Sequence, residues 1–306
     1  MILSVSRRTD IPNYYGEWFM RRLEEGVFYV KNPMKSHQVS RVRLSPEVID
    51  CIVFWTKNPK NFMPYLDRLS PYPYYFQFTL TGYGTDMEPG VPDKFGEMIP
   101  LFQELSRRIG KERVVWRYDP ILLSSRYTEK YHGRIFAEMA ARLEGYTQRA
   151  VISFLDLYGK TKRNLAGIVE EEIDRETMMR MAAHLAVIAE KHGIVLQACG
   201  EKENLSAVGV EAASCVDREL IETITGYRLK GRKDKNQRTA CGCLESIDIG
   251  AYDTCRNGCR YCYANLTDQR IRNQTRCYDI HSPLLCGVVE EGDKITDRIV
   301  RSLKER

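Results

Sequence analysis

Residues 244–262 read LESIDIGAYDTCRNGCRYC, a short run of strand-forming residues that leads directly into three cysteines. The run LESIDIG has the β-branched content and the length of a strand. Cys255, Cys259 and Cys262 follow it with a C-x3-C-x2-C spacing, and Gly258 gives the loop between them the freedom to curl. Residues 268–276 (DQRIRNQTR) then suit a helix that packs beside the strand. This stretch therefore predicts a strand, a cysteine loop and a helix in sequence.

The first 200 residues repeat the same alternation of strand and helix. Amphipathic stretches such as KFGEMIPLFQELSRRIG (94–110) and RETMMRMAAHLAVIAEKHG (175–193) separate short runs rich in β-branched and aromatic residues. Strands that alternate with helices predict parallel βαβ units, in an α/β fold whose sheet is buried on both faces. The predicted strands are residues 2–6, 51–55, 74–80, 113–118, 150–155 and 194–198.

The segments that follow these strands are rich in hydroxyl groups, charges and glycines. They read SRRTD, TKNP, TLTGYG, RYDP, DLYGK and CGE in chain order. Both open α/β sheets and barrels carry their chemistry on the loops after the carboxyl ends of the strands. We therefore expect the functional site at that end of the sheet.

Composition limits the class of protein. The 306 residues are 43% hydrophobic and 28% charged, and no run approaches the roughly 20 apolar residues that cross a bilayer. The N-terminal MILSVSRRTDIP lacks the apolar core of a signal peptide, so we expect a cytoplasmic protein without a membrane partner. The net charge of +5 permits an anionic partner. Six of the eleven residues 228–238 are Lys or Arg, which is typical of a solvated loop or of a contact with phosphate.

The distribution of the ten cysteines indicates metal binding. Nine of them fall between Cys199 and Cys286. Three thiolates from one tight loop match a [4Fe–4S] cluster and leave one iron open for a small molecule, whereas a structural zinc site usually takes its ligands in two pairs. The spacing, with an aromatic residue at Tyr261 and YAN directly after Cys262, predicts the cluster.

CRNGCRYCYAN resembles the cluster loop of the radical S-adenosylmethionine (SAM) superfamily, and CRYCYA is similar to the version in spore photoproduct lyase and its relatives. That superfamily has a (β/α)6 partial TIM-type barrel with the cluster loop in its first unit. ILSVSRRTDIPNYYGEWFMRRL, CIVFWTKNPKNFMPYLDRL, the stretch from YYFQFTL to the helix after EPGVP, and RVVWRYDPIL resemble its second to fifth units. The resemblance therefore implies one circularly permuted barrel over residues 1–306. In it the strand near 245–250 would lie in parallel beside the strand 2–6, because one SAM molecule must touch both the cysteine loop and the ends of the other strands. The permutation would also bring Cys241 and Cys243 next to the strand 194–198. Units two to six would occupy 1–198, a cysteine-rich and basic connection 199–243, and the relocated first unit with the tail 244–306.

The whole chain also resembles the family known as domain of unknown function 1848, through SRRTDIP, FWTKNP, FQFTLTGYG, VVWRYDPI, KDKNQR, CGC and DIGAYDTC. That family brings no assigned reaction. The radical SAM resemblance implies reductive cleavage of SAM at the cluster, with flavodoxin or ferredoxin as a suitable reductant. The substrate stays open, and nucleic acid is one candidate.

The same resemblance implies roles for residues at the strand ends. Lys57 is expected to hold the SAM carboxylate, since a compact ammonium group pairs well with it. Thr9 and Asp10 would face the SAM amino group, although Asp10 also suits a helix N-cap. Thr79 and Thr81 would approach the ribose, and Tyr261 the adenine. Arg117 and Asp119 are either functional or a structural pair.

Four further cysteines form a second candidate group: Cys199, Cys215, Cys241 and Cys243. Four thiolates suit a closed site that holds either an auxiliary [4Fe–4S] cluster or structural zinc, and a group without metal is the third option. We expect Cys51, Cys277 and Cys286 to be small buried residues or free thiols, and we assign no histidine as a metal ligand. Two other functions compete with the radical enzyme, namely a zinc-containing nucleic-acid-binding protein and an iron–sulfur electron carrier.

Overall fold

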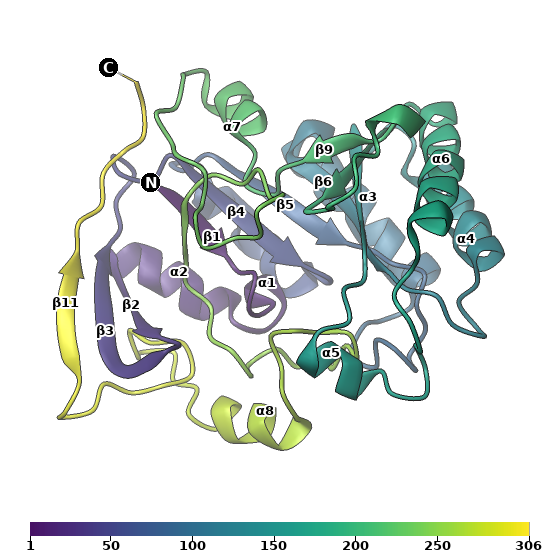
Figure 1. Cartoon of the computed structure of the whole chain (residues 1–306). Helices are drawn as coiled ribbons and strands as arrows, with labels where there is room; N and C mark the ends of the chain where they lie inside the picture. Colours follow the sequence, from purple (N-terminus) through teal and green to yellow (C-terminus); the bar gives the residue numbers. More distant parts are fainter. Residues whose placement is uncertain (306) are drawn as a thin grey trace.

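A single large sheet dominates the computed structural model, which describes residues 1–305 (Figure 1). Its eight strands are parallel and lie in the order β10-β1-β4-β5-β6-β7-β8-β9. Their bounds are β1 Ile2–Val5, β4 Cys51–Thr56, β5 Tyr74–Thr79, β6 Val114–Ile121, β7 Arg149–Phe154, β8 Val195–Cys199, β9 Glu211–Ala213 and β10 Ser246–Asp248.

All six strands predicted in the first 200 residues are present, so the α/β prediction is confirmed. The sheet has eight strands, however, where a six-stranded barrel was expected. Seven of the eight were predicted, namely the six strands of the first 200 residues and the strand before the cysteine loop, whereas β9, with three residues, was not. Within the described residues the sheet does not close, because β9 and β10 each have only one neighbour.

The C-terminal strand β10 pairs with the N-terminal strand β1, as the cysteine-loop argument predicted. Leu3 lies opposite Ile247, and Ser4 opposite Asp248. The Asp248 carboxylate fixes this edge, because it accepts hydrogen bonds from Ser4 Oγ at 2.6 Å, from Ser6 Oγ at 2.8 Å and from the backbone N–H of Arg7 at 2.8 Å. The two ends of the chain therefore build one edge of the sheet together.

One face of the sheet is covered by the segments that connect β1 to β8. Phe19, Phe62, Phe102, Phe136 and Leu185 of these segments belong to one core with the inward residues of the strands. The segments are α1 Ile11–Tyr14, α2 Gly16–Glu25, η1 Lys60–Leu69, η2 Lys94–Met98, α3 Ile99–Ile109, η3 Lys111–Arg113, α4 Glu129–Leu143, α5 Gly159–Asn164 and α6 Arg175–Lys191, of which η1 and η3 are 3-10 helices and η2 is a π-helix.

The opposite face carries a smaller core. Alternate strand residues such as Val53 and Val115 pack there against Leu220 and Ile221 of α7 (Arg218–Thr225). A 3-10 turn, η4 (Ser206–Val208), precedes this region. Because residues alternate between faces along a strand, this face also receives Arg117, which lies two positions after Val115. The polar site therefore starts where the smaller core ends.

A second sheet was not predicted. β2 (Val27–Asn32) and β3 (Lys35–Arg43) form an antiparallel hairpin, and β11 (Lys294–Arg298) pairs with β3 in parallel. The predicted helix after the cysteine loop is present as α8 (Asp268–Thr275). Among the described residues, no helix combines the length and the apolar character that a membrane span requires.

Candidate functional site

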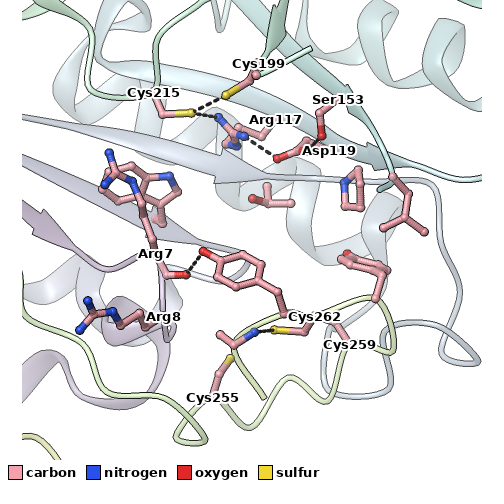
Figure 2. Close-up of a pocket in the computed structure, with 18 of the residues that line it drawn as sticks. Arg7, Arg8, Arg117, Asp119, Ser153, Cys199, Cys215, Cys255, Cys259 and Cys262 are labelled. Carbon is pink, nitrogen blue, oxygen red and sulfur yellow. Dashed lines mark hydrogen bonds and ion pairs between the residues drawn. The ribbon is translucent and has the colours of Figure 1, made fainter. Parts of the chain in front are cut away.

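A cavity of about 310 Å³ opens at the carboxyl ends of the strands, and it brings the two cysteine groups together (Figure 2). Residues after β1, β4, β7 and β8 line it together with the last residues of β6, so the cavity lies at the end of the sheet where the site was expected. All seven candidate metal ligands line this cavity: Cys199, Cys215, Cys241, Cys243, Cys255, Cys259 and Cys262. Figure 2 shows Cys255, Cys259 and Cys262 on one side of it and Cys199 and Cys215 on the other.

The three-cysteine loop is held in shape by its own backbone. Gly258 has φ of 65°, a left-handed conformation that favours glycine, and a Cβ there would lie 3.1 Å from Pro89. The N–H of Gly90 donates to the carbonyl of Asn257 at 2.9 Å. The Asn265 amide donates to the carbonyl of Cys255 at 2.8 Å. The loop therefore curls as predicted, supported by the segment around Pro89.

Burial makes the three thiols of this loop poor acids. It raises the pKa of Cys259 to about 12 and also raises the pKa values of Cys255 and Cys262. Three thiolates side by side in this loop therefore require a cation to stabilise them.

Asp10 connects the loop to two strand ends. Its Oδ1 accepts from the N–H of Asn13 at 3.1 Å and so caps α1, while its Oδ2 accepts from the N–H of Lys57 at 2.8 Å and from the Asn257 amide at 3.1 Å. Burial raises the pKa of Asp10, although these hydrogen bonds oppose the shift. Of the two roles expected for Asp10, the structure shows the N-cap. Its carboxylate is occupied with positioning the loop.

Lys57 extends from the end of β4 to the cysteine loop. Its Nζ lies 2.8 Å from Tyr261 Oη and 2.8 Å from Glu88 Oε1. Tyr261 also donates to Glu88, so the three side chains form one network between Cys259 and Cys262. Burial lowers the pKa of Lys57, but the Glu88 carboxylate outweighs it and the net shift is upward. Lys57 is therefore charged at the wall of the cavity.

The Glu88 carboxylate forms ion pairs with two lysines, Lys57 and Lys94. It also accepts from Thr81 Oγ1 at 2.8 Å. Burial raises the pKa of Glu88, but Lys57 and Lys94 outweigh it and bring the pKa to about 2. One carboxylate against two ammonium groups leaves one net positive charge beside the cavity.

The three threonines expected near SAM are placed differently from one another. Thr9 and Thr79 line the cavity, and Thr9 Oγ1 is buried without a hydrogen-bond partner among the described residues. Thr81 is not among the lining residues, because its hydroxyl is directed at Glu88. The structure therefore leaves Thr9 and Thr79 within reach of a ligand and gives Thr81 a supporting position.

The second cysteine group is also assembled. Cys199 Sγ lies 3.1 Å from Cys215 Sγ, and the backbone N–H groups of Cys215 and Val216 lie 3.2 Å and 3.4 Å from Cys243 Sγ. Cys241 is close enough to Cys243 for their thiols to hydrogen-bond, which lowers the pKa of Cys241 to about 7. The permutation argument expected Cys241 and Cys243 beside the strand that ends at Cys199, and this proximity is confirmed.

Arg117 and Asp119 lie between the second cysteine group and the rest of the cavity (Figure 2). Arg117 donates to Cys215 Sγ at 2.9 Å and pairs with Asp119, which in turn accepts from Ser153. Burial raises the pKa of Asp119, but Arg117 outweighs it, so the carboxylate stays ionised. Arg117 and Asp119 therefore form a structural ion pair, and Arg117 also contacts a cysteine of the second group.

The other cysteines lie outside the cavity lining. Cys51 is buried within β4, Cys286 is buried, and Cys277 is exposed, as expected for small buried residues or a free thiol. His37, Glu290 and Asp293 form a separate group of potential ligands, but Lys31 Nζ already lies 3.2 Å from Asp293 and 3.7 Å from Glu290. We assign no ion there.

The basic run 228–238 lies partly against the cavity and forms ion pairs with residues around it. Asp234 within it pairs with Arg7 at 3.7 Å, and Arg238 pairs with Asp156 at 2.6 Å. Gln237 and Arg238 line the cavity. Part of this run is therefore engaged in internal pairs, while Lys230 and Lys235 remain exposed.

Sequence reasoning missed three of the residues that organise the site. Glu88 was visible only as the first residue of EPGVP, Asn257 only as a polar residue within the cysteine loop, and Asp248 only as part of a strand. Each acts on partners far away in the sequence, so no local pattern reveals it.

The comparisons with known proteins give the family of the chain. No curated protein and no solved structure matches it significantly. The family model "Domain of unknown function (DUF1848)" matches residues 2–264, which include both cysteine groups and every strand of the large sheet. The chain therefore belongs to the DUF1848 family.

Proposed function

We propose that this protein is a radical SAM enzyme that binds a [4Fe–4S] cluster through Cys255, Cys259 and Cys262. The observation that supports this most is the position of Lys57, whose ammonium group contacts Tyr261 between the second and third cysteines. Lys57 and the three thiols come from segments about 200 residues apart, and all four line one cavity. A SAM molecule would have to contact both.

The residues around the cavity fit both the [4Fe–4S] cluster and SAM. Among the described residues, no three cysteine sulfur atoms lie within 4.8 Å of one another, so the loop is wider than a single ion requires. The cavity of about 310 Å³ falls within the range typical of small-molecule sites. Thr9 Oγ1 and Arg7 Nη2 are buried without partners, and both residues line the cavity, as groups awaiting a polar ligand would.

When bound, the cluster supplies the electron that cleaves SAM, delivered by a reductant such as flavodoxin or ferredoxin. The chain's own residues do the positioning. An ammonium group has three N–H donors, and Lys57 uses two of them on Glu88 and Tyr261, so the third is left for a carboxylate. Thr9 offers a hydroxyl from the end of β1.

The fold proposal that goes with this function is a circularly permuted partial barrel. The helices α1, α2, α3, α4 and α6 that connect the strands from β1 to β8 pack in one core on one face, whereas a doubly wound sheet has its connecting helices on both. β10, the cysteine loop and α8 then stand where the first unit of such a barrel would stand, next to β1. The N-terminal nitrogen lies 2.7 Å from the carbonyl of Arg301, so the two ends of the chain are close enough to have been joined.

The competing functions explain less of the site. A zinc-containing nucleic-acid-binding protein needs neither the Lys57–Glu88–Tyr261 network nor a cavity beside the three-cysteine loop. An electron carrier needs a cluster near the surface but no partnerless hydroxyl buried beside it. The radical enzyme uses all of these features.

The mouth of the cavity favours a single-stranded nucleic acid as the substrate. Tyr158, Tyr252 and Tyr263 are 45%, 37% and 42% exposed. The Arg8 guanidinium lies 5.1 Å from the Tyr252 ring and Lys160 Nζ lies 5.8 Å from it. Exposed aromatic rings beside cations are the usual means of stacking bases while contacting phosphates. We call Arg8, Tyr158, Lys160, Tyr252 and Tyr263 the rim.

Anaerobic reconstitution followed by measurement of 5′-deoxyadenosine tests the enzyme. With SAM and dithionite the wild-type protein should release 5′-deoxyadenosine. The triple variant C255A/C259A/C262A should lose about four irons and all of this activity. Continued SAM cleavage by the triple variant would contradict the assignment.

The rim is tested by charge reversal. R8E/K160E should weaken binding of a single-stranded oligonucleotide and flatten the slope of log K against log salt by about 1.4, since each lost phosphate contact removes roughly 0.7. K111E/K191E changes the net charge equally at two exposed residues that precede β6 and β8, at the other end of the sheet. It should leave the slope unchanged. Equal slopes for both double variants would rule out the rim as the binding surface.

A further inference from the structure

Two of the four thiols on the far side of the cavity accept hydrogen bonds of the kind that stabilise thiolates. Three N–H groups are directed at two of the sulfur atoms: the Arg117 guanidinium at Cys215 Sγ, and the backbone N–H groups of Cys215 and Val216 at Cys243 Sγ. Hydrogen bonds that favour the charged form of a group stabilise that form. This arrangement suits sulfur atoms that carry negative charge.

The burial of Arg117 supports the same conclusion. Arg117 is only 6% exposed, and its one carboxylate partner, Asp119, also accepts from Ser153. A buried guanidinium needs its N–H groups satisfied. Arg117 Nη1 has Cys215 Sγ at 2.9 Å and only a longer contact of 3.3 Å to Gln77. The better partner of this nitrogen is therefore the sulfur atom.

The sulfur atoms do not form a compact tetrahedron of the kind that a zinc site has. Tetrahedral zinc with Zn–S bonds of about 2.3 Å holds its four sulfur atoms about 3.8 Å apart. Within residues 1–305, no three cysteine sulfur atoms lie within even 4.8 Å of one another. The four thiols instead run as a chain of neighbours, with Cys199 against Cys215, Cys215 near Cys243, and Cys243 near Cys241. A cube of four irons binds each thiolate at a separate corner, so neighbouring sulfur atoms such as those of Cys199 and Cys215, which are 3.1 Å apart, would separate to hold it.

We propose that Cys199, Cys215, Cys241 and Cys243 bind a second, fully ligated [4Fe–4S] cluster, and that Arg117 is its positioning residue. Four protein thiolates leave no iron open, so this cluster does not bind SAM. It lies across one cavity from the three-cysteine loop, and a substrate in that cavity would lie between the two sites (Figure 2). The proposal does not depend on the activity of the first site.

The C255A/C259A/C262A variant provides the test, because it removes only the first site. After anaerobic reconstitution it should retain about four irons, a brown colour and, once reduced, an electron paramagnetic resonance signal that SAM does not change. The matched variant C241A/C243A should also retain about four irons, but its signal should respond to SAM. C241A/C243A should also lack the signal that SAM does not change, and this loss would assign that signal to the second cysteine group.

Two outcomes of the same experiment would overturn the proposal. One is stoichiometric zinc in the triple variant without iron. The other is a metal-free protein with a Cys199–Cys215 disulfide, detected by mass spectrometry of the unreduced chain. Failure of the first site alone would instead appear as loss of SAM cleavage by the wild-type protein with the SAM-independent signal intact.

The role of Arg117 can be tested by measuring the midpoint potential of the second cluster. R117M removes a positive charge next to Cys215, so the midpoint potential of the second cluster should become more negative, while R117K should restore most of the shift. R149M, which removes a partly exposed arginine paired with Asp217 outside the cavity lining, should leave the potential unchanged. Equal midpoint potentials in R117M and R149M would show that Arg117 is not a positioning residue of the second cluster.

Discussion

At the scale of single residues, Lys57 determines how the cavity would receive a carboxylate. In K57M we expect the affinity for SAM to fall at least about tenfold, equivalent to about 1.4 kcal/mol, because the charged donor is lost. Iron content should stay unchanged, since Lys57 contacts no cysteine sulfur directly. Equilibrium binding of SAM to the reconstituted protein measures the effect.

K94M is the matched control for this prediction. It removes the other ammonium partner of Glu88 and leaves Lys57 in contact with Tyr261. Affinity for SAM should therefore remain within about threefold of wild type. If K94M and K57M weaken SAM equally, the effect belongs to the network around Glu88 rather than to a contact made by Lys57.

The sequence allowed some of these residues to be predicted but not others. Lys57 could be found because it follows a strongly apolar strand, and strand ends meet at one edge of a parallel sheet. Glu88 could not, because its position depends on how the loop after β5 folds back onto the cysteine loop. Thr81 was expected at the ligand for the same reason that Thr79 was, and the turn of this loop directs it to Glu88 instead.

At the scale of elements, burial explains which strands could be predicted. The strands β1, β4, β5, β6 and β7 are almost wholly buried and read as apolar runs, whereas β8 is fully buried only at Leu196 and Ala198. β11 is exposed along its whole length, and β2 is mostly half-buried, so neither has an apolar run to reveal it. β9 is three residues long and has almost no pattern of its own.

The pairing of β10 with β1 can be tested at Asp248. D248A should lower the free energy of unfolding by about 3 kcal/mol, because two buried serine hydroxyls and the N–H of Arg7 lose the carboxylate that accepts from them. Chemical denaturation of the metal-free protein measures this change.

Ser246, on the same strand, gives the control. Its Oγ is buried without a partner among residues 1–305, so S246A should change the free energy of unfolding by no more than about 0.5 kcal/mol. An equally small effect of D248A would mean that Asp248 does not hold this edge of the sheet.

At the scale of the whole molecule, the contact between distant segments could be predicted because one ligand must touch all of its binding residues. That argument placed β10 beside β1 without any local signal. It could not reveal whether the second cysteine group binds a metal, since the spacing of the four thiols in space depends on the folds of β8, β9 and the segment before β10.

A rearranged chain tests the proposed permutation. A variant that begins at Ala240, continues to the C-terminus and runs through a short glycine–serine linker into Met1 should fold and bind the wild-type amount of iron. The new opening lies in an exposed stretch, and the N-terminal nitrogen is already 2.7 Å from the carbonyl of Arg301. Circular dichroism and iron analysis give the result.

A chain opened between Ile52 and Val53 is the negative control, because it cuts a central strand. It should not fold. If the variant that begins at Ala240 also fails to fold, the present order of segments is required and the permutation proposal loses its support.

The pairing of β10 with β1 also determines when the protein can mature during its synthesis. About 240 residues separate the two strands, and a ribosome that adds 5–20 residues per second needs roughly 12–48 seconds to make them. Throughout that time the edge of β1 has no partner on its outer side, and unpaired edges invite aggregation. Six of the seven cysteines around the cavity are made in the last third of the chain. The proposed clusters can therefore form only late in translation, and any chain that ends before Cys255 lacks the three-cysteine loop altogether.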